Sequence, residues 1–446
     1  MTDIERARFV RDALPSGGLF ADQHWRISPQ PFELEPRFAA ELESLGRVLL
    51  QFYRAVNLLY RKSLEGKAPG WVATLLDQGK PESLIAWQRD AGIKAEIPRV
   101  IRPDILLTEA GFAISELDSV PGGIGLTQWL NQTYSALAGA EGHSVESAVI
   151  GGPSGMKDGF ASLFGQAPRV RIIVSDESRS YRPEMEWLCG QMAAGRIGVT
   201  DPNEVDIQPG DAFYRFFELF DLGNVPVAAS LFERAAAREI FLTPPPKPIF
   251  EEKLLFALLW NRNLKPFWRQ ELGEGFLNRL LRVVPQTWVV DPAPLPPHAA
   301  YPGLDLTDWT QLKLLSQRER DLILKISGFS EQAWGARGVS LGSDMSTADW
   351  SAAVDEALGR WPRSPYVLQR FHKPRQVTSN YVDFTANALV PMAARVRLCP
   401  YYFVVGDGDA ARTRLGGVLA TVCPADKKIL HGMKDAALVP CRLGSE

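Results

Sequence analysis

The chain has 446 residues, of which 46% are hydrophobic and 23% charged, with a formal net charge of −3. This length predicts two or three domains, because a single hydrophobic core rarely extends beyond about 250–300 residues. The near-neutral charge gives no basis for a general nucleic-acid-binding or membrane-surface protein. No apolar run approaches the roughly 18 residues of a membrane-spanning helix, and the first residues lack the apolar core of a signal peptide. We therefore expect a cytoplasmic protein that binds neither nucleic acid nor membrane.

Hydrophobic periodicity divides the chain into four segments. Residues 1–99 are expected to form a helical N-terminal region packed on the core, because apolar residues recur there at three- and four-residue steps. Residues 100–149 hold a strand pair and a glycine-rich loop. Residues 150–245 alternate strands with helices, which is typical of a small open α/β unit. The proline-rich stretch Leu242–Pro248 is expected to be a linker into the last segment, 246–446.

The expected elements after residue 150 follow in chain order. The α/β unit should contain a strand at Val170–Ser175, a helix at Glu184–Met192, a strand at Arg196–Thr200 and a helix at Ala228–Arg238. From Leu322 onward five strand-like runs appear: LILKIS, YVLQRF, MAARVRL, YYFVV and GGVLATV. The last four runs are expected to share one mixed or antiparallel sheet. Four scattered cysteines without a CxxC pair predict buried free thiols.

Residues 100–118 predict a β-hairpin. Two strand-like runs flank Glu109-Ala110-Gly111, which suits a three-residue loop with glycine in the left-handed position. Such a loop pairs Thr108 with Phe112 and so sets the register. Because Pro103 has no N–H to donate, we expect a sheet edge or a bulge near it.

In that register Asp104 lies opposite Glu116, and Arg102 lies opposite Asp118. All four side chains share one face, because strand side chains alternate with a period of two. Three carboxylates this close repel one another unless a cation lies among them, and hard oxygen donors suit Mg²⁺. Arg102 is the candidate catalytic residue, since it could neutralise charge on a transferred phosphoryl group. The alternative is a solvated hairpin face with cross-strand salt bridges.

The hairpin leads directly into Ser119-Val-Pro-Gly-Gly-Ile-Gly. Closely spaced glycines let backbone N–H groups approach an anion or a substrate. An ordinary glycine turn is the alternative interpretation.

A second candidate region begins at Leu322. Lys325 lies in an apolar run, where an unpaired ammonium would be costly to bury. A loop with Gly335, Arg337 and Gly338 follows, so this region could hold nucleotide phosphates, although it matches neither the Walker nor the Rossmann pattern. A lysine at a strand edge followed by an ordinary loop is the alternative.

Two further strands add candidates for nucleotide contacts. Gln369 lies in the strand Tyr366–Phe371, which could present polar groups to an adenine edge. Arg395 and Arg397 lie two residues apart on a strand and therefore face the same side. Either arginine could contact a phosphate, with Arg397 the candidate we retain, and a surface charge pair is the alternative.

Together these motifs resemble the circularly permuted ATP-grasp proteins, of which the synthetase domain of glutathionylspermidine synthase is the familiar member. In that family an Arg-x-Asp on one strand and a Glu-x-Asn on the next bind magnesium and the γ-phosphate. Arg102 and Asp104 match the first pair, and Glu116 matches the glutamate. Asp118 stands where the family has asparagine, which keeps an oxygen ligand and adds a charge.

The resemblance extends from about Val100 to the C-terminus. Lys325 resembles the family's phosphate-binding lysine, with Ile326 in place of the usual proline. The segment from Asn261 resembles one that supplies a second lysine near the nucleotide, for which Arg262 and Lys265 are both candidates. Similar stretches also occur at Asp211–Leu219, Leu259–Trp268 and Pro400–Val404.

The resemblance implies an α/β (α+β) fold of ATP-grasp type, circularly permuted, with an inserted pre-ATP-grasp-like unit and a helical N-terminal region. It implies an ATP- and Mg²⁺-dependent carboxylate–amine ligase that acts through an acyl phosphate. Asp104, Glu116 and Asp118 would hold one or two Mg²⁺ ions. The substrates would be small molecules, with an amino acid, a peptide and a polyamine all open, as is the oligomeric state. The alternatives are a catalytically silent nucleotide-binding protein of this fold and a metal-dependent glycosyl- or nucleotidyltransferase.

Overall fold

The computed structural model describes residues 1–16, 19–20, 25–192, 195–333, 337–430 and 435–444. The chain forms two compact units, each taken here by itself. Unit 1 comprises Met1–Gln51, Ala91–Pro245 and Lys373–Glu446, and unit 2 comprises Phe52–Asp90 and Pro246–His372. These units cut across the four segments expected from the sequence, and that four-part division stays a prediction.

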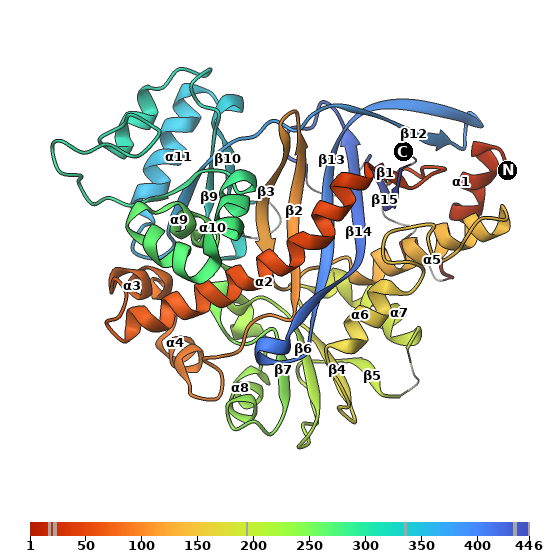
Figure 1. Ribbon diagram of the computed structural model, residues 1–446, viewed down its shortest axis with the longest axis horizontal. Helices are drawn as coiled ribbons and strands as arrows, with labels where there is room; N and C mark the ends of the chain where they lie inside the picture. The colour runs from red at the N-terminus through yellow and green to blue at the C-terminus, as the bar shows by residue number, and fades with distance from the viewer. Residues whose placement is uncertain (17–18, 21–24, 193–194, 334–336, 431–434, 445–446) are drawn as a thin grey trace. The chain divides into compact units, whose positions relative to one another are not determined.

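The main sheet of unit 1 has seven strands in the order β1-β15-β14-β13-β2-β3, with β12 paired to β13 (Figure 1). Only β1 and β15 pair in parallel within the described part of this sheet. The two expected strands MAARVRL and YYFVV form one continuous strand of 18 residues. The strands are β1 (Phe32–Leu34), β2 (Val100–Thr108), β3 (Gly111–Asp118), β12 (Val377–Asp383), β13 (Ala388–Val405), β14 (Arg412–Pro424) and β15 (Ala437–Leu443).

The register of the β2–β3 hairpin agrees with the sequence at the charged positions and differs at the loop. Arg102 pairs with Asp118, and Asp104 pairs with Glu116, as expected. Thr108, however, pairs with Gly111, so the expected three-residue loop is wrong and the loop holds only two residues. A register shift between Asp104 and Ile105 inserts one extra residue into β3 and restores the pairing. This β-bulge offsets the shorter loop and keeps the charged pairs opposite one another.

The ladder between β2 and β13 is interrupted beside the charged residues. Ile105 pairs with Leu398, and Ile101 pairs with Tyr402, with no pair between them. In this register Pro103 and Pro400 would lie opposite each other, and neither has an N–H group to donate. The disturbance expected at Pro103 is therefore present, although β2 lies inside the sheet and not at its edge.

A second sheet of unit 1 is wholly parallel, in the order β5-β4-β6-β7. Its strands are β4 (Val170–Val174), β5 (Ile197–Thr200), β6 (Ala212–Phe216) and β7 (Phe241–Thr243). Helix α7 (Arg182–Gly190) connects β4 with β5, and α8 (Ala228–Ala236) connects β6 with β7. Every strand and helix expected in this part of the chain is present, so the prediction of a small open α/β arrangement is confirmed.

The proline-rich stretch that follows β7 is buried. All residues from Leu242 to Phe250 are buried, and the peptide bond between Thr243 and Pro244 is cis. The chain does pass from unit 1 to unit 2 between Pro245 and Pro246. The prolines of the expected linker thus pack instead of projecting into solvent, and its role as a boundary between domains stays a prediction.

Unit 2 contains an antiparallel sheet in the order β10-β9-β11-β8. Its strands are β8 (Thr287–Val290), β9 (Leu322–Ile326), β10 (Val339–Leu341) and β11 (Tyr366–Arg370). The run YVLQRF is β11 and pairs with LILKIS, so its expected place in the C-terminal sheet was wrong. Periodicity identified both strands, but their pairing depends on tertiary packing.

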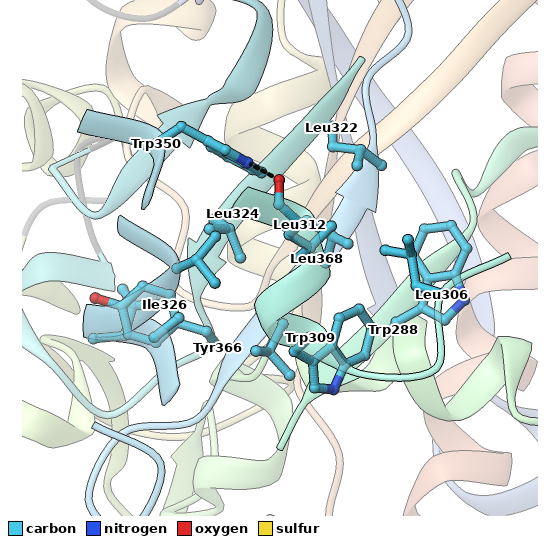
Figure 2. Close-up of a cluster of buried hydrophobic side chains, with 13 residues drawn as sticks. Trp288, Leu306, Trp309, Leu312, Leu322, Leu324, Ile326, Trp350, Tyr366 and Leu368 are labelled. Atoms are coloured by element: carbon cyan, nitrogen blue, oxygen red, sulfur yellow. Dashed lines mark hydrogen bonds between the residues drawn. The ribbon is translucent and has the colours of Figure 1, made fainter. Parts of the chain in front are cut away.

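The two faces of this sheet differ. One face packs Leu324 of β9 and Leu368 of β11 into a cluster of buried hydrophobic side chains with Trp288 and Trp350 (Figure 2). The indole of Trp350 donates a hydrogen bond of 2.8 Å to the carbonyl of Leu312, which satisfies its one polar atom. This packing fixes which side chains of β9 and β11 face away from the cluster.

The helices complete the two units. They are α1 (Asp3–Asp12), α2 (Pro36–Leu64), α3 (Trp71–Asp77), α4 (Glu82–Arg89), α5 (Ile124–Ala140), α6 (Gly155–Ser162), α9 (Leu254–Trp260), α10 (Lys265–Val283) and α11 (Thr347–Gly359). Helix α2 begins in unit 1 and ends in unit 2. Within the described ranges, no helix combines the length and apolar character needed to cross a membrane.

Candidate functional site

Charged side chains of β2, β3 and β13 form a continuous ion-pair chain in unit 1. Nη2 of Arg102 lies 2.9 Å from Oδ2 of Asp118 and 3.2 Å from Oδ1 of Asp104. Nη1 of Arg397 lies 3.0 Å from the other oxygen of Asp104. The structure thus brings together four residues that the sequence analysis selected. We call the set of Arg102, Asp104, Asp118 and Arg397 the arginine–aspartate cluster.

The cluster is largely shielded from solvent, with side-chain exposures between 10% and 20%. Burial is the largest single effect and opposes the charge of both arginines, but their surroundings, with Asp104 the largest favourable contribution, together outweigh it. The pKa of Arg102 and of Arg397 is therefore raised above the ordinary value. Asp118 raises the pKa of Arg102 further. Both arginines therefore carry a fixed positive charge. Their Nε–H groups are buried and have no hydrogen-bond partner among the described residues, which leaves donor capacity in the cluster.

Two residues of the cluster's surroundings were missed by the sequence analysis. The thiol of Cys399 donates to Oδ1 of Asp104 over 3.4 Å, and burial raises the pKa of Cys399 to about 12, so the thiol stays protonated. The hydroxyl of Tyr401 donates to the carbonyl of Gly122 over 2.7 Å. Both residues share the strand face of Arg397, and this two-residue alternation was the signal that could have found them.

The arrangement is not a preformed metal site. Among the residues that the structure describes, no group of three or more His, Cys, Asp or Glu side chains could hold a metal ion. The carboxylates of Asp104, Glu116 and Asp118 have the hard oxygen donors that Mg²⁺ prefers. However, Asp104 and Asp118 are bound to arginine, and Arg102 lies between them. As arranged, the two aspartates and the two arginines form an ion-pair network in which Arg102 lies where a metal ion between Asp104 and Asp118 would lie.

The glycine-rich turn after β3 is also occupied. The N–H groups of Gly123 and Leu126, at the start of α5, donate to the two carboxylate oxygens of Glu184 over 2.7 and 3.2 Å. Glu184 belongs to α7 and is buried, and burial raises its pKa to about 7 despite these hydrogen bonds. The anion that the turn was expected to attract is therefore supplied by the chain itself. Sequence alone gave no signal for Glu184, because the contact joins backbone groups to a distant helix.

The candidate nucleotide residues of unit 2 include one buried hydrogen-bonded pair. Nζ of Lys325 on β9 donates to Oε1 of Gln369 on β11 over 2.9 Å, and Nε2 of Gln369 donates to the hydroxyl of Thr287 over 3.1 Å. Both long side chains are buried, with residue exposures of 7% and 3%. Two residues selected independently from the sequence are thus brought together on the sheet face away from the hydrophobic cluster.

The remaining candidates of this region belong to the glycine loop that follows β9. Gly335 lies outside the described residues, and Arg337 is exposed. Gly338 donates its N–H to the carbonyl of Gln332 over 2.8 Å, and a Cβ added there would lie 2.6 Å from a methyl carbon of Ile326. Close packing against β9 therefore accounts for this glycine.

Lys265 and Arg262 are both exposed near the start of α10. Among the described residues, no contact favours one of the two over the other as a nucleotide-binding residue. Lys325 belongs to unit 2 and the arginine–aspartate cluster to unit 1. The composite site that joins them stays a prediction.

No family model matches the chain, and no curated protein matches it. Among solved structures, a glutathione synthetase-like effector from Globodera pallida, in its apo form, is similar over 99% of this chain and 97% of its own. The TM-score is 0.56 and the sequence identity 13%. A putative gamma-glutamylcysteine synthetase from Methylobacillus flagellatus KT is similar over 92% of this chain and 89% of its own, with a TM-score of 0.40 and 12% identity.

The first similarity shows a shared fold over nearly the whole chain. It agrees with the mixed α/β architecture that the sequence led us to expect. The circular permutation and the inserted unit stay predictions.

Proposed function

We propose that the chain is an ATP- and Mg²⁺-dependent carboxylate–amine ligase similar to glutathionylspermidine synthase. The observation that carries the proposal is the arginine–aspartate cluster, in which Arg102 and Asp104 are the residues that match the ATP-grasp motif. The fold shared with a glutathione synthetase-like effector supports it. The proposed substrates are a small carboxylic acid and an amine, such as an amino acid, a peptide or a polyamine.

The proposed reaction has two steps. A carboxylate oxygen of the substrate attacks the γ-phosphorus of ATP, and ADP leaves, which gives an acyl phosphate. The amine nitrogen then attacks the acyl carbon, phosphate leaves, and the nitrogen loses a proton. Arg102 carries a fixed positive charge and a free Nε–H donor, both suited to stabilising the oxygens that gain charge in these steps. Arg397 offers the same two properties and would act as the second contact.

Mg²⁺, when bound, would neutralise phosphate oxygens as a Lewis acid. Asp104, Glu116 and Asp118 are the residues proposed to hold it. Asp104 and Asp118 are bound to arginine in this structure, so the ion would share these carboxylates with the arginines or displace them. We therefore propose the two arginines as the groups that stabilise charge in both steps.

The nucleotide would be held by residues of unit 2. Lys325 supplies a point charge for phosphate oxygens, and Gln369 holds that charge by the hydrogen bond described above. Arg337, Gly335, Gly338 and Lys265 remain proposed contacts of the same nucleotide.

A second candidate is a nucleotide-binding protein of this fold that does not turn over. Two observations favour it: the carboxylates of the cluster are bound to arginines, and the N–H groups at the start of α5 are bound to Glu184. It predicts ATP binding without formation of ADP.

Trapping the acyl phosphate tests the proposal without knowledge of the amine. The protein is incubated with ATP, Mg²⁺, hydroxylamine and pools of amino acids, peptides and other carboxylic acids. Hydroxylamine converts acyl phosphates into hydroxamates, so a ligase should form hydroxamate and ADP in equal amounts. The R102M variant should form neither, and E109Q, a change at the exposed loop of the same hairpin, should behave as wild type. Nucleotide binding without ADP from any pool would refute the ligase and favour the second candidate.

A further inference from the structure

One peptide group connects Arg102 to the buried carboxylate of Glu184. The carbonyl oxygen of Gly122 accepts hydrogen bonds from Nη1 of Arg102 over 3.2 Å and from the hydroxyl of Tyr401 over 2.7 Å. The N–H of Gly123 donates to Oε1 of Glu184 over 2.7 Å. This C=O and this N–H belong to the same peptide. A carboxylate therefore polarises one end of the peptide, and a guanidinium polarises the other.

Close contacts hold this peptide in place and explain the glycines. Gly123 has a φ of +84°, and a Cβ added there would lie 2.7 Å from the hydroxyl oxygen of Tyr401. A Cβ added to Gly122 would lie 2.3 Å from the ring of Tyr181. The turn thus has glycine where neighbouring side chains leave no room for another residue. These contacts leave the peptide little freedom to rotate away from Arg102.

Glu184 is buried in a way that does not favour its charge. Burial raises its pKa to about 7, even though two backbone N–H groups and Arg102 favour the ionised form. Both carboxylate oxygens accept a backbone N–H, so a neutral glutamine would offer only one acceptor and would set its NH2 group against the other N–H. The geometry therefore calls for two acceptors at this place, and one of the two N–H groups belongs to the peptide that binds Arg102.

We propose that Glu184 is a positioning residue for Arg102. It holds the Gly122–Gly123 peptide so that its carbonyl oxygen fixes the guanidinium between Asp104 and Asp118. The inference rests on the proposed function for its activity readout, whereas the coupling between Glu184 and Arg102 does not depend on it.

Among the residues that the structure describes, the charged and titratable groups that face Glu184 come from three elements. They are Arg102 of β2, Tyr181 at the end of a short 3₁₀ turn, and Tyr401 of β13. Arg102 stays protonated, burial raises the pKa of Tyr181 to about 12, and burial raises the pKa of Tyr401 further. Of these four groups, Glu184 alone titrates near neutral pH.

The test combines E184Q with R102K in a double-mutant cycle, with E186Q as the matched control on the same helix. Glu186 is 55% exposed and forms an ion pair with Arg182 one turn away on the same helix. In the hydroxamate assay we expect E184Q to lower kcat/KM by about 10–100-fold, the usual effect of losing an outer hydrogen-bond partner. The E186Q variant should stay within about twofold of wild type. In the R102K background, E184Q should lower kcat/KM by less than about threefold, because its effect on activity acts through the arginine.

The pH profile separates positioning from a merely structural role. The wild-type profile should change near pH 7, and E184Q should lose that change. Full activity in E184Q, or an equal loss in both backgrounds, would overturn the proposal. If wild type shows no ligase activity, the proposed function fails and the cycle is read from urea midpoints instead. Non-additive midpoint shifts of E184Q and R102K support the inference, and additive shifts reject it.

Discussion

Replacing Glu184 with glutamine should change how the stability of the protein depends on pH. The pKa of Glu184 rises from 4.5 to about 7 in the folded state, chiefly through burial. Between these values the folded state binds more protons than the unfolded state, so the free energy of unfolding falls as the pH rises. The pKa difference is about 2.5 units, and at about 1.36 kcal/mol per unit it gives about 3 kcal/mol. Glutamine does not titrate, so E184Q lacks this loss.

The assay is urea unfolding of wild type, E184Q and the control E186Q at several pH values from 5 to 8. Wild type should lose most of about 3 kcal/mol relative to E184Q over this range, with the steepest change below pH 7. The E186Q variant should run parallel to wild type. Parallel curves for wild type and E184Q would show that Glu184 is not held at a raised pKa, and the reasoning about its burial would be refuted.

Three further predictions concern the turn, the buried lysine and the thiols. Gly123→Ala should lower the free energy of unfolding by about 1–3 kcal/mol more than Gly142→Ala. Both glycines have a φ near +84°, but only a Cβ at Gly123 would press against Tyr401. Equal melting temperatures of the two variants would contradict this prediction. Lys325→Met should raise the KM for ATP and lower the free energy of unfolding by about 1–3 kcal/mol. The loss of stability is expected because the change removes the donor to a buried oxygen of Gln369. Unchanged ATP kinetics would show that Lys325 does not belong to the nucleotide site. All four cysteines have a raised pKa, so a thiol reagent should react slowly at pH 8 until urea unfolds the protein, and fast native labelling would be a contradiction.

The charged hairpin was predictable because strand alternation is a strong local constraint. Asp104 and Glu116 lie opposite each other even though the loop is shorter than expected, since the bulge in β3 compensates for the missing loop residue. The prediction of the facing residues was thus right through two deviations that cancel. Two-residue alternation also explains why Arg397 lies on the same face of β13 as Cys399 and Tyr401.

Contacts between distant segments could not be read from the sequence. Glu184 binds backbone N–H groups, which every residue but proline possesses, so no side-chain pattern marks its partner. The run Tyr366–Arg370 has the composition of a strand, but its pairing with β9 is decided by packing against Trp288 and Trp350. The prolines of Leu242–Pro248 predicted an interruption of regular structure, yet they carried no information on burial.

The carboxylates show how the same residues allow two states. Their type and order indicated a metal site, and their geometry in this structure is an ion-pair network. The positions of the charges were predictable, but alternation along a strand carries no information on whether an arginine or a metal ion balances them.

The most direct test of the central claim is calorimetric titration with a non-hydrolysable ATP analogue, with and without Mg²⁺. It compares wild type with E116Q and with the hairpin-loop control E109Q. We expect the ATP analogue to bind in a Mg²⁺-dependent manner. Its affinity should fall by about 10–100-fold in E116Q and stay unchanged in E109Q. Absence of binding, or binding indifferent to both Mg²⁺ and Glu116, would contradict a nucleotide site at the arginine–aspartate cluster.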